Sequence, residues 1–209
     1  MEDYAWTPDE EIDKISAEYT QKLLDQMAVT VGYMGVNLES RDEIMRRYES
    51  NFGNFIADLM RTEFDTDFAL ANSGSFRKNS VIQAGPFNLM MVWESFPFND
   101  LSIVLEMSGH TFKKALEHAI SKWPSEDGCF PQVSNLQFIF DPEKPDGHRI
   151  ELFDIYAIGD GEFELNNRYK VAIPKFIANG GDGYDMFHNE DVKVIVDEEN
   201  GMWIIDIVK

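Results

Sequence analysis

Short segments with helical periodicity alternate with short strand-like segments along the chain, and this alternation is the strongest constraint on the fold. Apolar residues recur at helical spacing over residues 8–27 and again over 51–61. Compact apolar runs typical of buried strands occupy residues 67–71 and 169–173. Interleaved elements of both kinds predict an α+β fold, a single domain whose mixed β-sheet is packed by helices.

The remaining pattern supplies the other expected elements. Thr7, Pro8 and Glu10 predict a helix start at the front of the chain, and Ser108 predicts another. We further expect helices over 88–95 and 108–120, and strands over 28–33, 101–107, 136–140, 149–158 and 192–196, with a hairpin turn at Asp160-Gly161. The last residues, 201–209, are typical of the opening of an amphipathic helix, from which we expect a longer natural chain.

The charge balance is strongly acidic. The chain carries 18 Lys and Arg against 38 Asp and Glu, a formal net charge of −20. Such a chain repels nucleic acids and anionic lipid, so an anionic ligand would require a local cluster of arginines. No apolar run approaches the ~18 residues of a membrane span, and no apolar segment typical of a secretory signal follows the acidic start.

Catalytic chemistry has little support in the residue pattern. The single cysteine, Cys129, excludes an internal disulfide and a multi-cysteine zinc site. A nucleophilic pair of Cys129 with His118 is the less favoured reading, and a partly buried thiol is the ordinary one. His110 and His118 are eight residues apart on one predicted helix, about 12 Å, which is too far to share a metal ion. We therefore expect no metal site and no catalytic residue in this chain.

Two small-residue loops are candidate binding elements. Residues 72–77 follow a buried strand, where backbone amides and Arg77 could meet an anion, although the spacing alone favours an ordinary turn with a surface arginine. Residues 179–183 carry three glycines, which suit either close approach of a ligand or a tight turn. Phe98 and Phe176 lie near these loops in sequence and could stack on a flat ring, although phenylalanine is more often a core residue.

Several short blocks, taken in order, resemble a known family. The chain is similar to the C-terminal domain of the 5'-nucleotidase family from about residue 46 to residue 196. The blocks are ESNFGNFIAD at 49–58, NSGSFR at 72–77, FPFN at 96–99, KALEH at 114–118, PQVS at 131–134 and FIANGGDGY at 176–184.

The resemblance implies a division of labour between two domains. Residues 1–28 resemble an interdomain helix, and 29–209 resemble a substrate-binding domain truncated at its C-terminal helix. In the family, a separate N-terminal metallophosphoesterase domain holds two divalent metal ions and the catalytic residues. The resemblance therefore implies that this chain holds no cofactor of its own and is not catalytic alone.

The resemblance also assigns roles to residues. Phe98 and Phe176 resemble the aromatic pair that sandwiches a base, and Asn72 resembles the residue that hydrogen-bonds the base edge. Asp182 resembles the acceptor for ribose hydroxyls. Arg46 and Arg77 resemble the arginines that hold phosphate oxygens or the ribose side, with Arg47 and Lys78 beside them. The supporting loop residues are Gly74, Asn179, Gly180, Gly181 and Gly183.

These roles imply a ligand and a second domain as partners, and they leave one alternative function open. The expected ligand is a nucleoside monophosphate or a related phosphate ester, bound while a metallophosphoesterase domain of a longer protein hydrolyses it. Neither nucleic acid nor a membrane span is expected. The chain departs from the family at Ser73, Ser75 and Phe76, which leaves open an interaction or scaffold module that has lost nucleotide binding. The family is commonly extracellular or periplasmic, whereas the lone cysteine and the start of this chain allow a cytoplasmic location.

Overall fold

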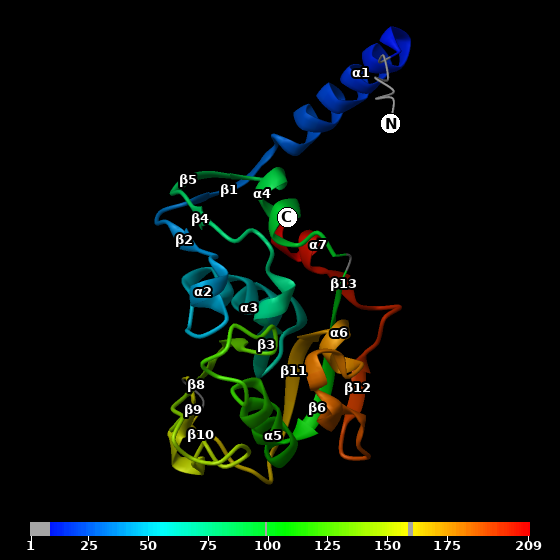
Figure 1. Ribbon diagram of the computed structural model, residues 1–209. Helices are drawn as coiled ribbons and strands as arrows, with labels where there is room; N and C mark the ends of the chain where they lie inside the picture. Colours follow the sequence, from blue (N-terminus) through cyan, green and yellow to red (C-terminus); the bar gives the residue numbers. More distant parts are fainter. Residues whose placement is uncertain (1–8, 99, 159–160) are drawn as a thin grey trace, which may run out of the picture.

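A mixed β-sheet forms the centre of the protein (Figure 1). The computed structural model describes residues 9–98, 100–158 and 161–209. The strands lie in the order β12-β6-β11-β3-β7, and β13 also pairs with β6. Only β3 and β11 run parallel to each other, while the other pairs are antiparallel. Their bounds are β3 Phe68–Asn72, β6 Leu101–Ser108, β7 Pro131–Ser134, β11 Arg168–Pro174, β12 Lys193–Val196 and β13 Met202–Trp203.

The two faces of this sheet bury different residues because side chains alternate along each strand. In β3, Phe68 and Leu70 enter a core shared with helix α5 (Gly109–Ala119). Ala69 and Ala71 face the second core, which contains the apolar side of helix α3 (Asn51–Phe64). Small alanines let α3 approach the sheet closely. The helix-on-sheet arrangement confirms the predicted fold class.

Capping side chains set the starts of the three longest helices, α1, α3 and α5. The Ser50 hydroxyl accepts from two amides at the start of α3, and the Ser108 hydroxyl accepts from the Thr111 amide at the start of α5, as predicted. In helix α1 (Glu10–Met27) the cap is Asp9, whose carboxylate accepts from the Glu11 and Ile12 amides at 3.0 and 3.3 Å. The predicted start at Thr7 and Pro8 lies outside the described residues.

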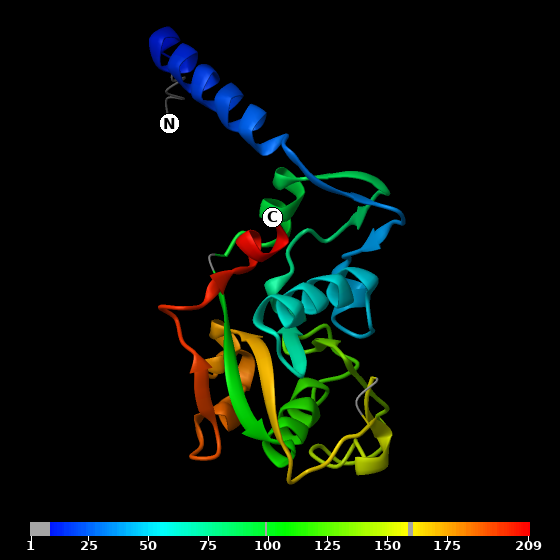
Figure 2. The ribbon, with the colours of Figure 1, turned by 180° about the vertical axis from the view of Figure 1, so that it is seen from behind.

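Helix α1 has no buried residue and projects away from the rest of the molecule (Figures 1 and 2). Besides short 3-10 turns, the described part of the chain holds three smaller sheets and four short α-helices. The sheets are β1 (Thr30–Met34) with β5 (Gly85–Asn88), β2 (Leu38–Glu39) with β4 (Val81–Ile82), and β8 (Leu136–Phe138) with β9 (Ile155–Ala157) and β10 (Gly161–Glu162). The helices are α2 (Asp42–Met45), α4 (Leu89–Ser95), α6 (Lys175–Ala178) and α7 (Ile204–Val208).

Three predicted elements are clearly shorter in the structure than the sequence pattern indicates. The strand expected over 149–158 reduces to β9, because the Arg149 and Ile150 amides donate to the Glu117 carboxylate, each at 2.9 Å, instead of to a neighbouring strand. The helix expected over 201–209 begins only at Ile204, because the preceding residues pair with β6 as β13. The strand expected over 136–140 ends at Phe138, and Asp160 of the expected hairpin turn lies outside the described residues.

Within the described part of the chain, no helix is both long and apolar enough to cross a membrane.

Candidate functional site

The strand directions bring four chain segments to one edge of the main sheet. Because β3 and β11 are parallel neighbours, the residues that follow both strands leave at the same edge. Strands β6 and β7 run antiparallel to them, so the residues that precede β6 and β7 meet at that edge too. The register shows this directly, since Ser102 pairs with Pro174 and Asn72 pairs with Pro131.

A cavity of about 590 Å³ lies where these segments meet. All six residues expected to bind substrate line it, and they come from four separate parts of the chain. Gly74 of the supporting loops lines it as well. The lining is completed by residues that the sequence did not single out as binding residues. The full set is Arg46, Asn72, Gly74, Ser75, Arg77, Phe98, Asp100, Asp127, Gly128, Phe176 and Asp182.

The two aromatic side chains are wall residues of this cavity. Phe98 is 55% exposed and Phe176 is 48% exposed, so neither belongs to the core. The guanidinium carbon of Arg77 lies 5.3 Å from the centre of the Phe98 ring, within the range of a cation–π contact. Gly181 provides room for the other ring, because a Cβ there would lie 2.6 Å from Phe176 ring atoms.

Asn72 and Asp182 form the polar floor of the cavity. The Asn72 Nδ2 donates to Asp182 Oδ2 at 2.6 Å, and the Ser75 hydroxyl donates to Asn72 Oδ1 at 2.7 Å. These two bonds fix the orientation of the Asn72 amide, with its donor side toward Asp182. Both glycines facing this floor are tightly placed, because a Cβ on Gly74 or Gly128 would lie 3.2 or 3.1 Å from Asp182 Oδ2.

The arginines are held by the protein itself. Arg46 donates to the Glu126 carbonyl at 3.3 Å and lies 3.5 Å from the Asp42 carboxylate. Arg47 pairs with Glu126 at 2.9 Å and does not line the cavity. Lys78, likewise absent from the lining, pairs with Glu94. The positive charges of Arg47 and Lys78 are therefore largely offset by neighbouring carboxylates.

Two further carboxylates line the cavity. Burial raises the pKa of the Asp100 carboxyl, whose Oδ1 accepts from the Phe176 amide at 3.3 Å. For Asp127, burial favours a higher pKa, but hydrogen bonds from Lys122 and the Cys129 amide outweigh it and lower the pKa. Asp100 could have been predicted as a lining residue, because it follows Phe98 by two positions. Asp127 could not, because its place at the cavity depends on the strand β7, which the sequence pattern did not reveal.

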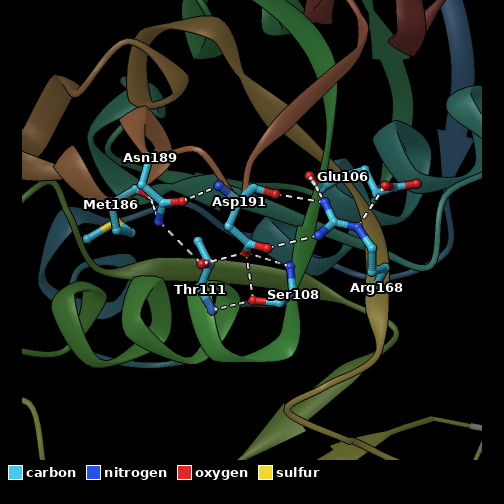
Figure 3. A network of polar contacts seen from close by, with 7 residues as sticks. All are labelled: Glu106, Ser108, Thr111, Arg168, Met186, Asn189 and Asp191. Carbon is cyan, nitrogen blue, oxygen red and sulfur yellow. Dashed lines mark hydrogen bonds and ion pairs between the residues drawn. The ribbon is translucent and has the colours of Figure 1, made fainter.

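The glycine-dense loop, residues 179–183, brings Asp182 to the cavity. Gly180 and Gly183 have φ angles of 84° and 86°, a region that favours glycine, and Asn179 is the exposed residue that ends α6. Further along the chain, Asp191 ties the segment after this loop to β6 and α5, because it accepts from the Ser108 amide and from the Ser108 and Thr111 hydroxyls and pairs with Arg168 (Figure 3).

The Cys129 thiol is unsuited to nucleophilic chemistry. It is buried, and burial raises its pKa to about 12, so the thiolate is scarce near neutral pH. Its sulfur contacts the His118 and Ala119 carbonyls at 4.0 and 3.6 Å. In the described part of the chain, no three or more His, Cys, Asp or Glu side chains gather in a way that could hold a metal ion.

A second cavity, of about 540 Å³, lies beside β7 and β8 and is lined largely by apolar side chains, five of them aromatic. Its one buried amide side chain, Gln132, already bonds three backbone groups, the Met45 and Tyr48 carbonyls and the Ser50 amide. The first cavity carries more converging polar groups, and we regard it as the candidate site.

Comparisons with known proteins agree with this geometry. Residues 30–189 match the family described as 5'-nucleotidase, C-terminal domain. The trifunctional nucleotide phosphoesterase protein YfkN of Bacillus subtilis is 32% identical over 84% of this chain and 12% of its own length. The human 5'-nucleotidase is 28% identical over 81% of this chain and 32% of its own length.

A solved structure shows the same fold. The 5'-nucleotidase precursor from Thermus thermophilus superposes with a TM-score of 0.82 at 29% identity, over 97% of this chain and 41% of that one. The chain thus spans less than half the length of each of these relatives.

Proposed function

This chain belongs to the family of 5'-nucleotidase C-terminal domains, and from that premise we propose that it recognises the nucleoside part of a nucleotide or related phosphate ester. The observation that carries the proposal is the convergence of all six expected binding residues on one cavity, although they are spread over more than a hundred positions of sequence.

In the proposed complex the base lies between Phe98 and Phe176. Both rings are about half exposed at the cavity wall, where a flat heterocycle would cover them. Asn72 bonds the base edge, and Asp182 accepts from ribose hydroxyls, a role that suits a group with acceptors only.

The charge of the cavity favours the nucleoside over the phosphate as the group bound here. Two guanidiniums, those of Arg46 and Arg77, line it together with the three carboxylates of Asp100, Asp127 and Asp182. This lining has no excess of positive charge. We therefore assign the arginines to the ribose side of the ligand or to a phosphate that reaches out of the cavity.

We assign hydrolysis to a separate metallophosphoesterase domain. Among the described residues, no three or more His, Cys, Asp or Glu side chains gather in a way that could hold a metal ion, and the related enzymes are more than twice as long as this chain. Isolated, the chain is expected to bind nucleoside without hydrolysing AMP, and turnover by a rigorously purified sample would contradict this assignment.

Calorimetric titration with adenosine and AMP tests the proposal. A stacked base contributes ~1–3 kcal/mol, so Phe176→Ala should weaken adenosine binding roughly 5- to 150-fold. Tyr156→Ala is the matched control, because Tyr156 has the same 48% exposure as Phe176 but lies in β9, away from the cavity.

The outcomes separate the two functions under consideration. Weaker binding in Phe176→Ala alone supports nucleoside recognition. Equal heats in all three proteins, or no heat in any, would instead favour a scaffold module that kept the fold and lost the ligand.

A further inference from the structure

Asp182 has an unusual backbone that requires an explanation. Its φ is 53° and its ψ is 17°, in the left-handed region that a side chain disfavours. Within the loop, the Gly183 and Tyr184 amides bond back to the Gly180 and Gly181 carbonyls, each at 3.2 Å. A left-handed residue that is not glycine persists only when its surroundings hold it there.

His118 provides that hold from outside the loop. Its Nε2 lies 2.8 Å from the Asp182 carbonyl oxygen. A carbonyl can only accept, so Nε2 carries the hydrogen and donates. His118 comes from the last turn of α5, 64 positions earlier in the chain, so this bond ties the loop to the main core.

The imidazole is itself closely fitted. It packs edge-on against Tyr184, with ring centres 4.9 Å apart, and the Tyr184 hydroxyl donates to the Cys129 carbonyl at 2.7 Å. A Cβ on Gly183 would lie 2.8 Å from His118 Cε1, so glycine at that position leaves the space that the ring occupies.

The other side of Asp182 faces the cavity, where its Oδ2 accepts from Asn72. His118 thus fixes the peptide of Asp182 while Asn72 fixes its carboxylate. We propose that His118 is a positioning residue, which sets the direction of the Asp182 carboxylate and thereby the recognition of the ribose hydroxyls. This inference rests on the proposed function of the cavity.

The binding experiment compares adenosine with 2',3'-dideoxyadenosine, which lacks the hydroxyls that Asp182 would accept. A single hydrogen bond of this kind corresponds to roughly a 3- to 10-fold change in affinity. We expect His118→Ala to lower the preference for adenosine by that factor, and His118→Gln, whose amide can donate from a similar position, to restore it within about twofold. His110→Ala, an exposed histidine on the same helix, should leave the preference unchanged.

A second arm makes the effect specific. In an Asp182→Ala background, His118→Ala should change the preference no further, because the residue through which it acts is gone. An unchanged preference in His118→Ala alone, or an equal loss in both backgrounds, would overturn the positioning role.

A ligand-free measurement separates failure of this inference from failure of the proposed function. The Asn72 side-chain amide, which bonds the Asp182 carboxylate, is followed by ¹⁵N–¹H correlation spectra. It should shift in His118→Ala and stay near its wild-type position in His118→Gln and His110→Ala. If this amide shifts but no nucleoside binds, the proposed function of the cavity is overturned. If it does not shift, the role of His118 is overturned.

Discussion

Replacing Gln132 with alanine should strongly destabilise the fold. This β7 side chain is 1% exposed. Its Nε2 donates to the Met45 and Tyr48 carbonyls, both at 2.9 Å, and its Oε1 accepts from the Ser50 amide at 3.1 Å. One amide therefore satisfies three backbone groups of the link between α2 and α3, the link that also carries Arg46.

The magnitude follows from those three bonds. Each contributes about 1 kcal/mol net, and a buried backbone group left without a partner costs about 1–3 kcal/mol. Water entering from the adjacent second cavity can replace part of the loss, since Gln132 lies in the wall of that cavity. We therefore expect Gln132→Ala to lower the free energy of unfolding by about 3 kcal/mol, a large share of a typical total of roughly 5–15 kcal/mol.

Urea unfolding followed by circular dichroism measures this change. Gln137→Ala is the matched control, because Gln137 lines the same cavity from an exposed position on β8, and its change should stay within about 0.5 kcal/mol. Gln132→Glu should be no better tolerated than the alanine, because a carboxylate oxygen would then face two carbonyls. A loss below about 1 kcal/mol in Gln132→Ala would refute the reasoning, since the three groups would then be satisfied without the side chain.

Two further predictions follow from shifted pKa values. Hydrogen bonds from the Ser108 hydroxyl and amide, and then from Thr111 and Arg168, hold the pKa of Asp191 well below its usual range. The free energy of unfolding of wild type should therefore exceed that of Asp191→Asn by the largest amount above the ordinary carboxyl pKa of about 4, and this difference should shrink as the pH falls below that value. Urea unfolding at pH 7 and pH 3 measures the change. Burial raises the pKa of Cys129 to about 12, so the folded protein should react slowly with a disulfide reagent at pH 8 and quickly in urea; rapid labelling of the folded chain would contradict the burial.

The main elements of the fold could be predicted because their local signals agree with the packing. The serine before α5 caps it as expected, and the apolar runs of β3 and β11 are the buried centre of the sheet. The strand β7 gave no such signal, because it is only four residues long and begins with proline. The segment at 149–150 looked like a strand, but a buried carboxylate, Glu117, took its amides.

The candidate site depended on a different kind of information. Periodicity cannot show which strands are parallel, and the cavity exists because β3 and β11 are parallel neighbours flanked by antiparallel strands. The resemblance to a family supplied this information, because members of one family share a strand order. The six residues chosen through the resemblance do line one cavity. The resemblance did not indicate Asp100 and Asp127 as lining residues. Without these two carboxylates, the balance of charge in the cavity could not be predicted.

Polar side chains from outside the cavity help to hold its walls in place. Gln132 fixes the segment of Arg46, Asp191 anchors the segment that follows the glycine-dense loop, and His118 holds Asp182 within that loop. Each of these bonds is directional, so the loss of one should displace a wall segment while most of the two apolar cores stays packed. Substitutions at these positions should therefore weaken ligand binding even under conditions in which the fold remains intact. The residues that shape the site are thus largely different from the residues that touch the ligand.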